Sequence, residues 1–161
     1  MVTEMVNPND KAFGQFSSAQ SQRPNTLDPV EIILDTQEDT VGKEHTINFN
    51  KGDIMVKNSG MYLVIAGPQI GKLKGDKPRW IDFWLRVNNV DVPNSNVRSI
   101  VTAACEKDVI ITQTVTRLNS GDTLNIMMAV ENTEEGLGIE AIQPVGEPLV
   151  PSIILTILQL Q

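Results

Sequence analysis

The chain offers few residues that could do chemistry, and their spacing does not assemble a known kind of site. There is one histidine, His45, and one cysteine, Cys105, among 161 residues. Zinc sites draw mainly on several histidines and cysteines, so only carboxylates could complete one here. The Gly-x-Ser-x-Gly elbow of many serine hydrolases is missing from the sequence. We therefore predict no catalytic site, no metal and no cofactor, and interpret His45 as structural or solvent-exposed.

Acidic side chains are the next candidates. Paired carboxylates can bind calcium or flank a glycosidic bond. None of these residues shows the alternating Asp-x-Asp-x-Asp-Gly spacing of a preformed calcium loop, so we interpret them as solvated acidic loops. The candidates are Asp35, Glu38, Asp39, Glu134 and Glu135. Cys105 follows two alanines, and we expect it to be a small buried side chain rather than a nucleophile.

Two features could recognise a partner. Trp80 and Trp84 share one face of an expected strand, where they could stack a sugar ring or, as we favour, pack against a loop or subunit. Residues 72–79 hold the one concentrated positive charge in a chain of net charge −7. They could dock on an acidic surface, although a solvated loop is the simpler interpretation. The possible partner-contact surface is Lys72, Lys74, Lys77, Arg79, Trp80 and Trp84.

Composition bounds the class of protein. The net charge of −7 argues against a nucleic-acid partner, and no apolar run approaches the roughly 20 residues of a membrane-spanning helix. The first residues lack the basic-then-apolar pattern of a secretory signal. A single cysteine excludes an intrachain disulfide, which fits assembly in a reducing cytoplasm. We expect a protein made in a cytoplasm, with neither a nucleic acid nor a membrane as partner.

The pattern along the chain indicates an all-β protein. Turn signals such as Asn58-Ser59-Gly60 recur between short stretches rich in Val, Ile and Thr, which is typical of a sandwich or barrel. Residues 1–11 are polar and are expected to form an N-terminal arm, followed by one domain over residues 12–161. The expected strands span 12–18, 30–35, 45–49, 53–57, 61–67, 80–88, 97–104, 109–118, 122–131 and 151–160.

Alternation assigns the faces of several strands. Ile81, Phe83, Leu85 and Val87 should face the core, and so should alternate residues of 124–130, with Thr123, Asn125 and Met127 facing outward. The threonines of 109–118 share parity with apolar residues, which predicts a β-bulge. Residues 61–66 and 153–158 are apolar on both faces. Such strands must be covered twice, and we expect the second cover to be another copy of the chain.

Five motifs, in order, resemble the tumour necrosis factor and complement-type jelly-roll superfamily. They are Ala12-Phe13-Gly14, Ser59-Gly60-Met61-Tyr62-Leu63, Leu85-Arg86-Val87-Asn88-Asn89, the Leu118 to Leu124 turn with its Gly121-Asp122, and the final strand from Ser152 to Leu160. The resemblance covers roughly residues 12–160. It implies a two-sheet antiparallel jelly-roll sandwich that assembles as a homotrimer about a threefold axis.

The resemblance also implies which residues meet at that axis. In the superfamily the first, the Gly-x-Tyr and the final strands share an inner sheet, whose outer face lines the threefold axis. The matching axis residues are Met61, Leu63, Ile65, Ile154, Leu158 and Leu160. The alternate residues, which should fill the sandwich, are Tyr62, Val64, Ile153, Leu155 and Ile157.

Three functions are compatible with this reading. The first is a non-enzymatic virion structural protein, a trimeric bacteriophage head decoration (cement) protein that docks on a capsid shell protein at the virion surface. Its polar arm would lie on that partner, since such termini are usually mobile unless tied down. The alternative is a receptor- or glycan-binding tip of a phage fibre or spike, or a bacterial adhesin. A hydrolase on the same scaffold would need a carboxylate pair or triad that the sequence does not offer.

Overall fold

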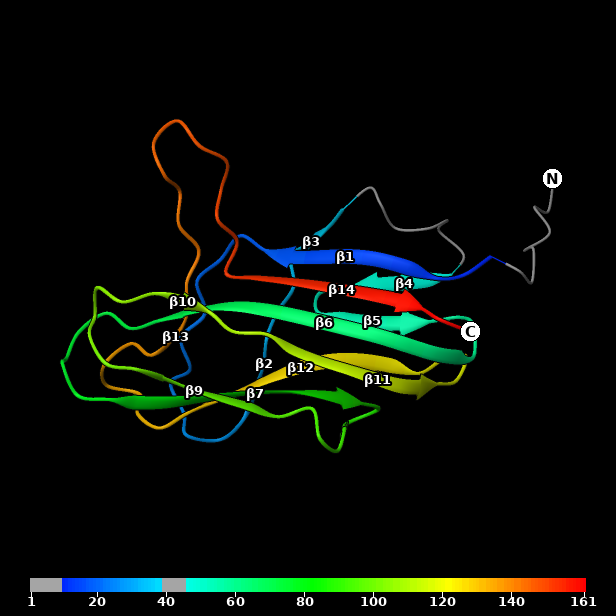
Figure 1. Ribbon diagram of the computed structural model, residues 1–161, viewed down its shortest axis with the longest axis horizontal. Coiled ribbons are helices and arrows are strands. Elements are labelled where there is room, and N and C mark those ends of the chain that lie inside the picture. Colours follow the sequence, from blue (N-terminus) through cyan, green and yellow to red (C-terminus); the bar gives the residue numbers. More distant parts are fainter. Residues whose placement is uncertain (1–9, 39–45) are drawn as a thin grey trace.

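A computed structural model of the chain describes residues 10–38 and 46–161 (Figure 1). His45, Asp39 and residues 1–9 of the expected arm lie outside these described residues. The described part contains fourteen β-strands and no helix, and hence no helix with the length and apolar character needed to cross a membrane. Two antiparallel sheets share one apolar core, so the all-β, two-sheet prediction is confirmed.

The inner sheet is built around the longest strand. Its order is β3 (Thr36–Gln37), β1 (Phe13–Ser18), β14 (Ile153–Gln159), β6 (Gly60–Gly71) and β11 (Thr112–Leu118). Near its C-terminal end, β6 pairs instead with β13 (Gly138–Ile139) on one side and β10 (Asp108–Val109) on the other. The first and last strands of the fold are therefore neighbours, with β14 between β1 and β6 (Figure 1).

The outer sheet is built around β7 and β12. Its order is β4 (Ile47–Asn50), β5 (Asp53–Val56), β12 (Thr123–Val130), β7 (Arg79–Val87) and β8 (Val90–Asp91). Two further strands, β2 (Val30–Glu31) and β9 (Val97–Val101), pair with β12 and β7. The inward residues Ile81, Phe83 and Leu85 are fully buried, as the alternation predicted, because they close the core from this side.

Residues 30–35 do not form the continuous strand that was expected. Only Val30 and Glu31 pair with β12, and the chain then crosses from the outer sheet to the inner one. Ile32 still donates its backbone N–H to Ile126 in the outer sheet, at 2.9 Å, whereas Asp35 donates to Ser17 in the inner sheet, at 3.0 Å. Ile32 and Leu34 are buried because the crossing passes beside the core, whereas Ile33 is exposed. The prediction of a continuous strand was therefore wrong, although the segment does contribute to the core.

The bulge expected in residues 109–118 is absent from this described stretch. Val109 lies opposite Gln69 and Thr112 lies opposite Ala66, so both strands advance by three residues and the register does not slip. The ladder is interrupted because Pro68 accepts a hydrogen bond from the Ile110 N–H at 3.2 Å but has no N–H to return. The threonines do face inward, and Thr112 donates its hydroxyl to the Ser95 carbonyl at 2.6 Å.

Cys105 is exposed, which corrects the expectation of a buried side chain. It lies in a turn after β9, where the Glu106 carboxylate accepts hydrogen bonds from the backbone N–H groups of Thr102 and Ala103 at 3.1 and 2.9 Å. These bonds satisfy the turn locally, so no burial of Cys105 is needed to hold it.

The loops separate into two groups at the two ends of the sandwich. The chain's C-terminus and the start of β1 lie at one end (Figure 1). The β6–β7 loop of residues 72–79, the turn of residues 102–107 and the hairpin between β13 and β14 lie at the other end (Figure 1). The arm and the basic loop, the two segments expected to meet a partner, therefore start from opposite ends of the molecule.

Candidate functional site

The outer face of the inner sheet carries a ladder of apolar side chains drawn from four strands. Phe13 of β1 lies opposite Leu158 of β14, which lies opposite Leu63 of β6, and Leu63 in turn lies opposite Val115 of β11. The exposed fractions of Phe13, Leu158 and Val115 are 43%, 38% and 54%. Because residues directly opposite on neighbouring strands have adjacent Cβ atoms, these four side chains form one continuous apolar rung.

A second apolar rung lies towards the loop end of the molecule. Ile154 of β14 is opposite Gly67 of β6. A Cβ atom placed on Gly67 would lie 3.1 Å from Cδ1 of Ile111 and 3.6 Å from Cγ1 of Val109. The glycine therefore leaves room for these two exposed side chains to lie across β6, which keeps the face flat and apolar. Between the two rungs Ile65 lies between Thr156 and Gln113.

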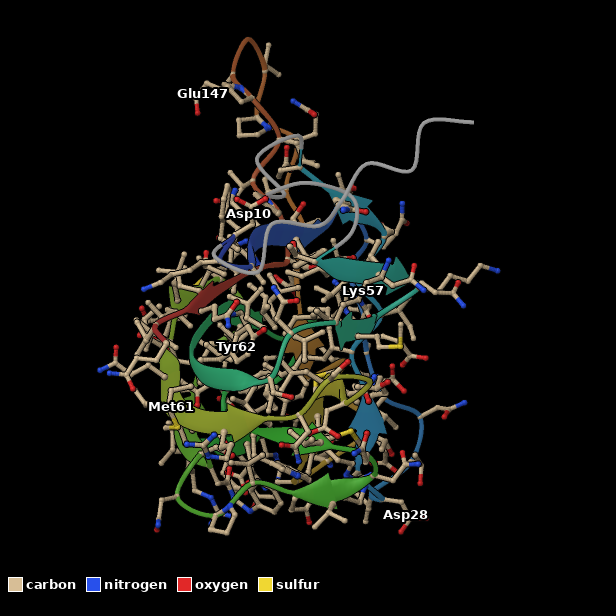
Figure 2. The ribbon with its side chains drawn as sticks, turned by 90° about the vertical axis from the view of Figure 1, so that its right-hand side faces the viewer. Asp10, Asp28, Lys57, Met61, Tyr62 and Glu147 are labelled. Atoms are coloured by element: carbon tan, nitrogen blue, oxygen red, sulfur yellow. The ribbon has the colours of Figure 1, made fainter. Side chains whose placement is uncertain are left out.

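The structure divides the residues of β6 and β14 between the two faces as the sequence predicted. Tyr62, Val64, Ile153, Leu155 and Ile157 are fully buried in the sandwich. Met61, Leu63 and Ile65 are half-buried on the outer face, and Ile154, Leu158 and Leu160 are exposed there. Figure 2 shows the alternation at two neighbours, with Met61 at the surface and Tyr62 inside. A threefold axis through this face stays a prediction.

Sequence reasoning missed the part of this face contributed by the flanking strands. Phe13, Val109, Ile111 and Val115 are all exposed on it. In β11, Val115 alternates with the threonines and is flanked by Gln113 and Arg117, so its neighbours resemble an ordinary solvent face. Only the register with β6 shows that Val115 continues the rung of Leu63.

Tyr62 locks the start of β6 from inside. Its hydroxyl donates a hydrogen bond to the Asn58 carbonyl at 2.7 Å, across the turn that precedes the strand. Burial raises the pKa of Tyr62 to about 12, so the hydroxyl keeps its proton and remains a donor. This contact ties the buried side of β6 to the turn that precedes the strand.

Two of the four basic residues in the loop of residues 72–79 form ion pairs with Glu135 of the same chain. Lys72 is buried, with Nζ 3.0 Å from the Glu135 carboxylate and 2.6 Å from the Lys77 carbonyl. Arg79 donates to the other Glu135 oxygen at 2.8 Å. Lys72 is therefore not available to a partner, which corrects that part of the expected contact surface. Lys74 and Lys77 are exposed.

Glu135 is the centre of this loop. Its backbone carbonyl accepts the N–H groups of Leu73 and Lys74 at 2.9 and 3.2 Å. The hydrogen bond from Arg79 and then that from Lys72 lower the pKa of Glu135 to about 2. Glu135, considered from the sequence as a loop carboxylate, thus serves as an anchor between the β6–β7 loop and the β12–β13 loop.

The two tryptophans are half-buried on the outer sheet and have protein partners. The Arg98 guanidinium lies 4.2 Å from the ring centroid of Trp80 and makes two hydrogen bonds to Asp82, at 2.7 and 2.8 Å. The Trp84 indole N–H donates to Asp91 at 2.7 Å. One face of Trp80 is therefore occupied by a cation–π contact from β9, rather than by the loop or subunit that was expected.

A polar pocket of about 440 Å³ lies on the outer sheet, lined by Glu31, Asp53, Asn88, Asn89, Thr123 and Asn125. Asn125 was expected to face solvent, but it is buried because its amide donates to the Glu31 and Asp53 carboxylates and to the Gly52 carbonyl. Met127 is also buried, which corrects its assignment as outward. Burial and then the negative charge of Asp53 raise the pKa of Glu31.

The remaining acidic candidates have separate roles. Asp35 accepts the backbone N–H of Ala19 at 3.1 Å and closes a loop, and Glu38 lies beside Ser17. Glu134 is exposed. Within the described ranges, no three His, Cys, Asp or Glu residues are placed to hold a metal ion.

The comparisons with known proteins agree with this architecture. No protein-family model matches the chain, and no curated protein matches its sequence. Crystal structures of murine APRIL at pH 5.0 and pH 8.0 superpose with TM-scores of 0.57 and 0.58, at 11% and 12% sequence identity. Each alignment covers 93% of this chain and 99% of the other. The chain therefore has a tumour necrosis factor-like jelly-roll fold.

The Glu135 anchor gives a pH-dependent prediction. A carboxylate whose pKa falls from its usual 4.5 to about 2 adds stability that is complete above pH 4.5 and is lost as pH falls towards 2. The thermal midpoint of Glu135→Gln should lie below that of the unmodified chain at pH 7, and the gap should close between pH 4.5 and 2. The control is Glu134→Gln, and an equal loss in that variant would contradict the anchor.

Glu31 should show the opposite trend. Because its pKa is raised above 4.5, its folded form holds a proton more tightly, so its contribution is greatest at low pH and falls as pH rises through the raised pKa. Glu31→Gln should therefore equal the unmodified chain near pH 4 and become the more stable of the two at pH 8. Chemical denaturation at both pH values measures this, and a Glu31→Gln variant that is less stable at pH 8 would refute it.

Proposed function

We propose that the chain is a non-enzymatic structural protein that associates as a homotrimer through the outer face of its inner sheet. The observation that carries this proposal is the pair of apolar rungs across β1, β14, β6 and β11. Among the residues of these rungs and of the mixed rung between them, none is charged. A sheet face of this kind is normally covered, and an uncovered one would form a large apolar patch on a monomer.

Energetics support coverage by other copies of the chain. Fully burying one Leu, Ile, Val or Phe side chain is worth about 1.5–3 kcal/mol. The side chains on this face are about half-exposed, so each would gain a part of that amount, but every copy contributes several. A closed rotation uses the same face in each subunit and leaves no apolar surface uncovered. Three copies is the number implied by the resemblance to the jelly-roll superfamily.

We propose further that the trimer is a decoration, or cement, protein of a bacteriophage head, docking on the capsid shell. The N-terminal end is the better supported attachment point. Lys11 donates to the Leu160 carbonyl at 2.7 Å and Ala12 donates to the Gln159 side chain at 2.9 Å, so residues 11 and 12 are held beside the C-terminal residues. The basic loop at the opposite end keeps only Lys74 and Lys77 free, with Asp76 between them, which weakens its attraction to an acidic surface.

The receptor- or glycan-binding tip is the second candidate from the sequence. It would need an open aromatic platform, and Arg98 covers one face of Trp80. We therefore favour the structural role. A broad glycan panel distinguishes the two, because saturable binding that is lost on Trp84→Ala would contradict the structural proposal.

Leu63→Lys should dissociate the trimer without unfolding the subunit. Leu63 lies at the centre of an apolar rung but outside the sandwich, so the substitution places a charge in each copy of the proposed interface while the core stays intact. We expect the midpoint concentration for dissociation to rise by at least about tenfold. For a monomer–trimer equilibrium this is about a hundredfold change in the dissociation constant, or about 2.7 kcal/mol per trimer. Light scattering coupled to size exclusion measures the change.

The matched control is Val90→Lys, at an exposed position of the outer sheet. Its mass should equal that of the unmodified chain. The interface assignment would be wrong if Leu63→Lys kept the unmodified mass at every concentration while circular dichroism showed a folded protein.

Attachment to a shell is tested by mixing the trimer with undecorated phage heads. We expect co-sedimentation and a higher melting temperature of the heads, because a ligand that binds only the assembled shell stabilises it. A chain lacking residues 1–9 should stay trimeric but lose binding, whereas Lys74→Glu with Lys77→Glu should retain it. Binding that survives the truncation and is lost with the lysine pair would place the contact at the other end.

A further inference from the structure

The hairpin of residues 140–152, between β13 and β14, projects from the loop end of the sandwich with Glu147 near its tip (Figures 1 and 2). At its base Ile142 and Val150 exchange two backbone hydrogen bonds, at 3.0 and 2.8 Å. Further out, the Gln143 side chain donates to the Glu147 carbonyl at 2.9 Å. Among the described residues, the hydrogen-bond partners of residues 143–149 all belong to the hairpin itself. The conformation of the hairpin is therefore held by its own contacts.

The tip presents an exposed apolar side chain beside one charged residue, between two prolines. Val145 is fully exposed and Leu149 is exposed beside it, while Glu147 is the only charged residue among positions 141–152. Pro144 and Pro148 fix the backbone on either side of the tip. A preformed apolar protrusion loses little conformational entropy on docking, which suits it to insertion into a pocket.

A pocket of suitable size lies at the same end of the molecule. It has a volume of about 240 Å³ and is lined by Ile70, Ile100, Val101, Glu106, Lys107 and Asp108. Ile100 is 60% exposed, whereas Ile70 and Val101 are buried behind it. Lys107 pairs with the buried Glu140 carboxylate, which holds the charged side of the pocket in place. Its apolar side is formed by Ile70, Ile100 and Val101, and its charged side by Glu106, Lys107 and Asp108.

The base of the hairpin adjoins the pocket through the Glu140–Lys107 pair, but the tip of the hairpin lies on the opposite flank of the inner sheet. The hairpin extends past β1 and β3 (Figure 1). The pocket is lined by residues of β6, β9 and β10 and of the turn between β9 and β10. Both border the apolar face, because Ile154 follows the hairpin and Val109 follows Asp108 of the pocket. Two different surfaces on opposite flanks of a subunit can pair between neighbouring copies as a heterologous contact. If the copies are related by rotation about an axis parallel to the strands, the contact repeats and closes into a ring.

We propose that the tip of the 140–152 hairpin docks in the Ile100 pocket of the neighbouring copy. Each subunit then gives one hairpin and receives one, so a trimer contains three such contacts. This inference rests on the proposed homotrimer and adds to it a second contact outside the apolar sheet face. The hairpin residues 141–151 are not part of the hydrophobic core of their own subunit, which fits a role in contacting another copy.

Disulfide trapping tests the contact, because the exposed Cys105 is the only cysteine and adjoins Glu106 of the pocket. Val145→Cys places a second thiol at the tip. Mild oxidation with copper phenanthroline at micromolar protein should give covalent trimers on a denaturing non-reducing gel, since every copy carries one donor and one acceptor thiol. Val145 is fully exposed, so the substitution should not disturb folding.

Two controls accompany the trapping. Val145→Cys combined with Cys105→Ser should stay monomeric on the gel, and so should Val90→Cys, whose thiol lies at the opposite end. The native mass of the reduced Val145→Cys chain shows whether a missing covalent trimer means that the hairpin contact is wrong or that the chain does not form a trimer. A trimeric mass without covalent trimers would overturn the hairpin contact and leave the proposed function standing, whereas a monomeric mass would overturn both.

Discussion

The structure depends on one constraint, which is that the central strands of the inner sheet are apolar on both sides. One side is covered by the chain itself, where Tyr62, Val64 and Leu155 are fully buried against the outer sheet. The other side carries Met61, Leu63 and Ile154, and no second sheet of the described residues covers them. Because a sheet buried on one face normally presents polar residues on the other, this doubly apolar pattern supports the proposed association of copies of the chain. The inner sheet is therefore both the wall of the core and the proposed interface.

Other features keep that interface flat and nearly free of charge. Gly67 leaves space for Ile111 and Val109, and Pro68 interrupts the ladder without shifting the register. Two groups of ion pairs lie at the loop end, where Glu135 pairs with Lys72 and Arg79, and Glu140 pairs with Arg23 and Lys107. These ion pairs hold the loops of that end without placing their charges on the apolar face.

Sequence reasoning reached the fold class and the alternation of β6, β7 and β14, because period-two patterns depend only on local geometry. It missed what depends on pairing between distant segments. The crossing after Glu31, the burial of Asn125 between two carboxylates and the pairing of Lys72 with Glu135 each join residues far apart in the chain. Val115 looked like part of a solvent face until its register beside Leu63 placed it on the apolar rung. Hydrophobicity alone could not show that Cys105 sits in an exposed turn.

The central claim is that copies of the chain cover the outer face of the inner sheet, and the mass of the unmodified protein in solution tests it most directly. Sedimentation equilibrium at micromolar concentration should give three times the 17.7 kDa of one chain. Dilution should lower that mass in a single step to the monomer, as expected for a closed ring. A folded chain that stays at 17.7 kDa up to high micromolar concentration would contradict the account, because its apolar rungs would then be stable in water.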